Sequence, residues 1–237
     1  KSGLWAALTK SIDLSITAAG LGGEIDLDFS MEEKKGWRLK GALRRLELER
    51  LPWIKDALSV PITGSLSAKI DLELPQHRWA EATGAIDLEC DNAAVGDGKT
   101  MIKVPGNELL AMGVTLPRLR IGRLAGQIKI EKGTASFENV AARSPDVEIA
   151  LEGNLSFRDP VTFSSAQAYL RFKISPELKQ REPKFELVEN GLSAARRTDG
   201  FIGAQMVGPL RGLRFIPSPL GPAREPTRRL APGSGFR

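Results

Sequence analysis

Seven residues near the start of the chain, Gly23-Glu24-Ile25-Asp26-Leu27-Asp28-Phe29, decide the class of fold. Apolar and acidic side chains alternate strictly in this segment, and successive side chains of a β-strand point to opposite faces. One face therefore carries Ile25, Leu27 and Phe29, and the other carries the three acids. The pattern predicts a strand with one side packed and the other in water.

The same pattern, alternating apolar and polar residues after a glycine, returns at residues 68–74, 84–89, 126–131 and 153–157. We expect each glycine to open its strand or to turn the chain just before it, where a side chain would crowd the neighbouring backbone. The apolar positions of all five segments are predicted to form one inner face, which consists of Ile25, Leu27, Phe29, Ile70, Leu72, Ile86, Leu88, Ile128, Ile130, Leu155 and Phe157.

Short turn signals such as Lys35-Gly36 and Lys132-Gly133 separate the alternating runs, so neighbouring runs are expected to pair as antiparallel hairpins. Many runs exceed the usual strand length of about 5–6 residues. Long strands in this order predict a mainly β protein built on one long, curved antiparallel sheet, a half-pipe, with a few short helices. The helices are expected at residues 51–58, 107–112 and 183–195.

The composition excludes several classes of protein. The chain has 237 residues with one Cys and one His, so an internal disulfide and a Cys/His zinc cluster are both ruled out. His77 is expected to be a surface residue, and Cys90 a free thiol in the polar phase of its strand beside Asp91. No nucleophile motif or phosphate loop is present. We therefore expect no enzymatic activity, no metal and no cofactor.

Carboxylates recur in pairs two residues apart, and on a strand each pair shares one face. Such a pair would suit the acid/base couple of a hydrolase or a calcium site. Their place at the polar phase of successive repeats favours a solvated outer face instead. The pairs are Asp26 with Asp28, Asp71 with Glu73, and Asp87 with Glu89.

The excess of basic over acidic residues is confined to the C-terminal end of the chain. The net charge is +5, and the six arginines and single acid from Arg211 onward account for all of it. A nucleic-acid binder would carry its basic patch on the folded domain, interleaved with aromatic residues, whereas this charge lies in a segment rich in Pro and Gly, so nucleic acid is not an expected partner. We expect a β-rich domain over residues 1–216 and a flexible Pro/Arg-rich tail over residues 217–237.

Two uses of the inner face stay open at this point. The apolar side chains of a single curved sheet can close on one another as a core, or they can line a groove for acyl chains. The open edges of such a sheet can also pair with a partner strand.

Three segments carry a resemblance to a known family: residues 119–135, residues 151–155 and residues 199–210, the last followed by a short closing strand at 211–216. In these segments the chain resembles the AsmA-like periplasmic proteins and, more closely, the type II secretion system protein N family. The resemblance covers roughly residues 4 to 216 and rests on repeated strand patterns, with no catalytic signature.

The resemblance implies a periplasmic domain that is anchored to the inner membrane by an N-terminal segment absent from this chain. It implies a non-enzymatic accessory subunit of type II protein secretion, with other secretion components as partners and with phospholipid or the inner-membrane surface as a further contact. The alternative is a lipid-binding or lipid-transfer protein that uses an apolar groove inside the curved sheet. No site residue is carried over from the family.

Overall fold

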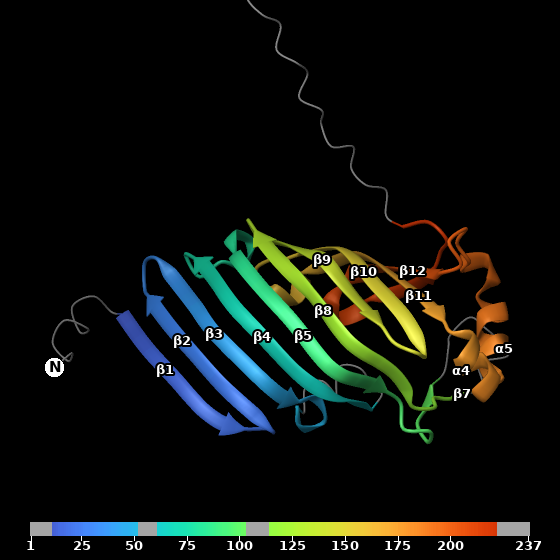
Figure 1. The fold of residues 1–237 in the computed structure, drawn as a ribbon. Coiled ribbons are helices and arrows are strands. Elements are labelled where there is room, and N and C mark those ends of the chain that lie inside the picture. Colours follow the sequence, from blue (N-terminus) through green and yellow to red (C-terminus); the bar gives the residue numbers. More distant parts are fainter. Residues whose placement is uncertain (1–10, 52–60, 103–113, 222–237) are drawn as a thin grey trace, which may run out of the picture.

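The computed structural model describes residues 11–51, 61–102 and 114–221. These residues form one antiparallel sheet of eleven strands, joined in the order β1-β2-β3-β4-β5-β8-β9-β10-β11-β12-β13, together with a small β6-β7 pair (Figure 1). The predicted mainly β fold is therefore confirmed. The strands are β1 (Ser11–Gly20), β2 (Gly23–Glu32), β3 (Gly36–Glu47), β4 (Ile62–Pro75), β5 (Thr83–Val95), β6 (Met101–Ile102), β7 (Val114–Thr115), β8 (Leu119–Glu131), β9 (Thr134–Arg143), β10 (Val147–Ser156), β11 (Ser165–Ile174), β12 (Ile202–Pro209) and β13 (Arg214–Pro217).

The large sheet is curved and open. Strands β1 to β5 and β8 lie side by side in Figure 1, and β9 to β12 turn behind β8. The first and last strands of the sheet, β1 and β13, are not paired with each other. Several strands are long, with 14 residues in β4 and 13 each in β5 and β8. Sequential pairing of long strands gives the half-pipe that the sequence predicts.

The repeated glycines occupy two kinds of position. Gly84 lies near the start of β5 with a φ of +143°, and an added Cβ would strike the carbonyl oxygen of Asp71 on the neighbouring strand β4. Gly126 and Gly153 instead lie in the middle of β8 and β10, so the expectation that each glycine opens its strand is wrong for these two. Both sit at shifts in strand register, where a glycine lets the backbone bulge toward its neighbour.

The helices are short and gather after β11. The expected helix at 183–195 is present as α5 (Lys184–Gly191) followed by the 3-10 turn η4 (Ser193–Ala195). The helix α4 (Pro176–Arg181) was not predicted, although Ser175 caps it by accepting a hydrogen bond from the Leu178 amide at 3.0 Å. The helix expected at 107–112, and that at 51–58 beyond Leu51, lie outside the described residues. The other 3-10 turns are η1 (Leu48–Arg50), η2 (Trp79–Glu81), η3 (Val161–Phe163) and η5 (Leu210–Gly212).

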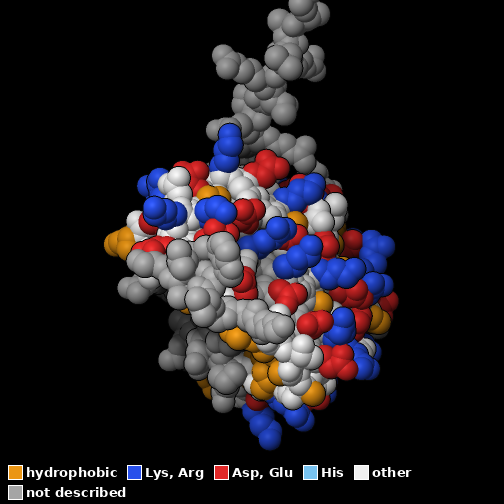
Figure 2. All heavy atoms as spheres, turned by 90° about the vertical axis from the view of Figure 1, so that its left-hand side faces the viewer, with side chains coloured by type: hydrophobic (Ala, Val, Ile, Leu, Met, Phe, Trp, Pro, Cys, Tyr) orange, Lys and Arg blue, Asp and Glu red, His pale blue; other side chains and the backbone are white. Residues whose placement is uncertain are grey.

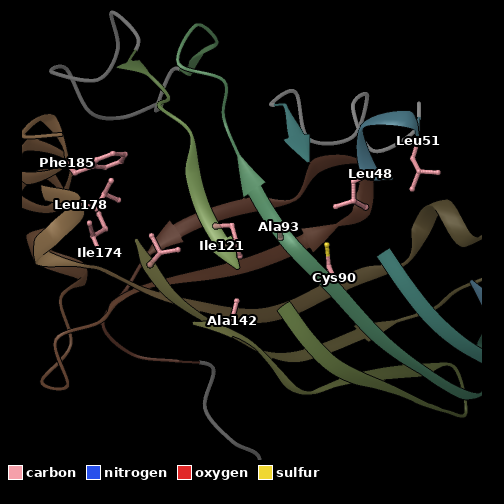
Figure 3. Packing of buried hydrophobic residues seen from close by; sticks show 10 residues of the cluster. Leu48, Leu51, Cys90, Ala93, Ile121, Ala142, Ile174, Leu178 and Phe185 are labelled. Atoms are coloured by element: carbon pink, nitrogen blue, oxygen red, sulfur yellow. The ribbon is translucent and has the colours of Figure 1, made fainter. Parts of the chain in front are cut away.

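Two clusters of buried side chains lie at opposite ends of the strands. The helix-side cluster lies where α4 and α5 cover the sheet, and Figure 3 shows Phe185 and Leu178 extending from the helices toward the strand that carries Ile121. At the other end, the tryptophan cluster surrounds Leu74, and Trp79 of η2 packs there between Trp37 and Phe157, with ring centroids 5.8 and 5.3 Å away. Because Trp37 lies on β3 and Phe157 directly follows β10, a strand far from β3 in the sheet, this face is the concave one.

The last described residues pack against the sheet. Tyr169 is fully buried, and its hydroxyl donates to the carbonyl oxygen of Ser218 at 3.0 Å. The Ser218 amide donates to the carbonyl of Gly203 at 2.9 Å. Residues 217–221 of the expected tail therefore belong to the described structure, and residues 222–237 lie outside the described residues.

Candidate functional site: the apolar concave face

The sheet register brings the predicted inner-face residues together. Ile86 on β5 pairs with Ile70 on one side and Ile128 on the other. A first row of cross-strand partners runs through Ile16, Leu27, Gly41, Ile70, Ile86, Ile128, Phe137 and Gly153. A second runs through Leu14, Phe29, Leu39, Leu72, Gly84, Ile130, Ala135 and Leu155, and a third through Ala18, Ile25, Leu43, Ala68, Leu88 and Gly126.

The concave face is apolar but only partly buried. Of the eleven predicted inner-face residues, Leu72 and Ile130 are buried and the other nine are half-buried. Toward the edge of the sheet the exposure rises, and Leu14 and Ile16 on β1 are 50% and 42% exposed. Packing is therefore tight beside the tryptophan cluster and loosens progressively toward β1.

A small apolar cavity continues this face beneath the helices. Its volume is about 180 Å³, and every described residue that lines it is apolar. The strand residues in it belong to alternating runs that the sequence shows, but α4 and α5 add side chains that no strand pattern could have indicated. The lining consists of Leu119, Ile121, Val147, Ile149, Leu170, Phe172, Ile174, Leu178, Phe185 and Val188.

The convex face is charged, as the sequence predicts. The Asp71 carboxylate accepts hydrogen bonds from Arg38, and this contact is the largest cause of a pKa below the usual aspartate value. Similar pairs join Arg123 to Glu89 at 2.7 Å and Lys129 to Glu138 at 2.8 Å. Figure 2 shows acidic and basic side chains intermingled over the surface at the β1 end, with hydrophobic groups in its lower part. The paired carboxylates therefore face solvent.

Cys90 is a free thiol, as predicted, but its predicted place in the polar phase of the strand is wrong. Cys90 lies in the apolar phase with Leu88, pairs with Leu66 and Leu124, and is only 4% exposed. Burial, the largest cause, raises the pKa of its thiol to about 11, and Asp91 adds to the effect. The regular spacing of Ile86, Leu88 and Cys90 in the sequence indicates that Cys90 lies on the same inner face as the two apolar residues.

The other candidate ligands of the sequence are dispersed. His77 is exposed, with its Nε2 atom 3.1 Å from the carbonyl oxygen of Glu33. Within the described ranges, no three His, Cys, Asp or Glu side chains lie close enough to hold a metal ion. The concave face is thus the candidate site: it extends over many strands of the described structure, and its side chains are apolar throughout.

Comparison with known proteins gives no relative: no family model, no curated protein and no solved structure matches the chain. In the part of the chain that the structure describes, none of the helices has the length and apolar character needed to span a membrane. The function is therefore inferred from the geometry of the concave face.

Proposed function

We propose that the protein binds the acyl chains of lipids along its concave face. The observation that carries this proposal is the row structure of that face, in which nine of the eleven predicted inner-face side chains stay only half-buried. Leaving such a surface in water costs about 25 cal/mol for each Å² of apolar area. An extended apolar patch on a soluble domain marks a binding surface more often than an isolated exposed Leu does.

The shape of the face suits an extended chain. Gly41 and Gly153 occupy positions within the rows and add no side chain to the face. Gly41, for example, lies between the larger residues Leu27 and Ile70. The tryptophan cluster fills one end, and the apolar cavity lies at the other. An acyl chain has no hydrogen-bonding groups along its length, so a lining without polar side chains is the chemistry that it requires.

The role in type II secretion stays a prediction from the resemblance, together with the periplasmic location and the membrane anchor. The contacts described above neither favour nor oppose it. Lipid binding was the alternative to that role, and it is the alternative that the geometry favours.

A chain-length series tests the proposal. Saturated fatty acids of increasing length would be titrated into the full chain by competition with a fluorescent fatty acid. Each buried methylene contributes about 0.8 kcal/mol, so the affinity should rise about fourfold for each added CH₂. The rise should stop once the chain fills the face. Binding that does not depend on chain length would refute the proposal.

Two adjacent residues of β2 provide a matched pair of variants. Ile25 is half-buried on the concave face, whereas Glu24 is exposed on the convex face. Ile25→Gln should weaken binding at least about fivefold, because it places an amide among the bound methylenes. Glu24→Gln should leave binding unchanged. Equal effects of the two variants, or native mass spectra that stay free of lipid after incubation with vesicles, would count against an acyl-binding face.

A further inference from the structure

A second hollow lies on the opposite face of β8 from the apolar cavity, at the end of the sheet where α4 and β7 lie (Figure 1). Its volume is about 560 Å³. Leu119 and Ile121 line the apolar cavity, whereas Arg118, Arg120 and Gly122, which alternate with them, line this one. We call it the arginine pocket, and its other polar lining residues are Asn92, Ser144 and Arg181.

The charge of the arginine pocket is unbalanced. Three arginines line it, and among the described residues the one carboxylate that pairs with any of them is Asp146, which is fully buried and contacts Arg120 and Arg181. Arg120 donates to Asp146 through Nε at 3.1 Å and Nη2 at 2.7 Å, and Arg181 donates through Nη2 at 3.0 Å. Among the described residues Arg118 has no ion-pair partner. The group therefore keeps two net positive charges.

Asp146 also fixes the position of the arginines. It sits in the turn between β9 and β10, where the Ser144 hydroxyl accepts from its amide at 3.1 Å. Its carbonyl oxygen accepts from the amide of Ser175, the residue that caps α4. The hydrogen bond from Arg120 is the main reason that the pKa of Asp146 lies far below its usual value. Arg120 and Arg181 are thus held beside the pocket with Arg120 Nη1 and two nitrogens of Arg181 still unused by Asp146.

From this geometry we infer that the arginine pocket binds the phosphate group of a phosphate ester. A phosphate monoester carries about −1.5 to −2 charges at neutral pH, which matches the excess of two positive charges. Guanidinium groups donate two parallel hydrogen bonds to phosphate oxygens, and Arg118 is free to do so. A carboxylate would leave half of the charge unbalanced.

The lining argues against a nucleic acid as the source of the phosphate. The described residues of its lining include no aromatic side chain on which a base could stack. The ester is therefore either a soluble small molecule or the headgroup of a lipid. The lipid source rests on the proposed function, whereas the phosphate site itself does not.

Titration of the full chain with glycerol 3-phosphate, followed by calorimetry, tests the site. Arg118→Gln removes a side chain without an ion pair, so the fold should be retained, and binding should weaken about tenfold or more. Arg158→Gln is the matched control, because Arg158 is exposed, makes no ion pair with the described residues and lies at the other end of β10. It should bind as the wild type does.

Vesicles distinguish the two sources. Binding to phosphatidylcholine vesicles that contain phosphatidic acid, lost in Arg118→Gln and kept in Arg158→Gln, would show a lipid headgroup. Binding of glycerol 3-phosphate without a matching effect on vesicles would show a soluble ester. If Arg118→Gln binds both probes as the wild type does, or if neither probe binds the wild type, the inference fails. A fatty acid carries no phosphate, so failure here would leave the chain-length test of acyl binding untouched.

Discussion

Replacement of Asp146 by Asn tests how the end of the sheet next to α4 is held together. The carboxylate accepts four hydrogen bonds, three from Arg120 and one from Arg181, and all lie between 2.7 and 3.1 Å. An Asn keeps one acceptor oxygen and turns an NH₂ group toward a guanidinium. Because Asp146 has no contact with water, the lost bonds cannot be replaced on that side.

The magnitude follows from these contacts. A hydrogen bond to a charged group contributes about 1.5–3 kcal/mol, and breaking a buried ion pair costs about 3–5 kcal/mol. The arginine side chains are 54% and 46% exposed, so they regain water and reduce the loss. We expect Asp146→Asn to lower the free energy of unfolding by about 3 kcal/mol, or Tm by about 6–12 °C for a domain of this size. Urea denaturation followed by tryptophan fluorescence measures it.

The stability difference between the wild type and Asp146→Asn should depend on pH, in a direction set by the pKa of Asp146. The pKa of Asp146 in the folded chain lies below the ordinary value of 3.8, so its stabilising effect is complete above that value and is lost as the pH falls below it. The difference between the wild type and Asp146→Asn should therefore be full at neutral pH and shrink steadily as the pH is lowered below about 4. Asp87→Asn, on the exposed outer face, should change stability by less than about 0.5 kcal/mol. A loss below about 1 kcal/mol at pH 7, or a gap that stays constant with pH, would refute the reasoning.

Four other results are expected from the same structure. Ile130→Asp should cost more than about 3 kcal/mol in urea denaturation, because it buries a charge in the tryptophan cluster. Cys90 should react with iodoacetamide at pH 8 only when urea unfolds the chain, since its thiol is buried and its pKa is raised to about 11; labelling at the same rate without urea would contradict this. Gly84→Ala should lower stability by about 2 kcal/mol, because its Cβ meets the carbonyl of Asp71 at a φ of +143°. Ser175→Ala should cost about 1 kcal/mol by removing the cap of α4, as thermal unfolding would show.

The unpredicted parts of the site share one cause. Arg118 and Arg120 lie two residues apart at the start of a strand. This spacing predicts that they share a face, but it does not indicate which residues they contact. Arg181 comes from a helix that the sequence did not reveal, and Asp146 from a turn. Their meeting depends on how far β8 to β11 curl before the chain enters α4. No local pattern contains that information, because curvature sums small changes of twist and register over many strands.

The sequence by itself determined the two-faced strands and the antiparallel pairing of those joined by short turns. Period-2 alternation assigns each side chain to a face, and a short turn leaves the two strands that it joins side by side. Only the tertiary structure decided how much of that face is covered, that Cys90 belongs to it, and that Arg120 of β8 and Arg181 of α4 both pair with one buried carboxylate. Burial and charge pairing are properties of distances between residues far apart in the chain, and those distances are fixed when the whole sheet bends.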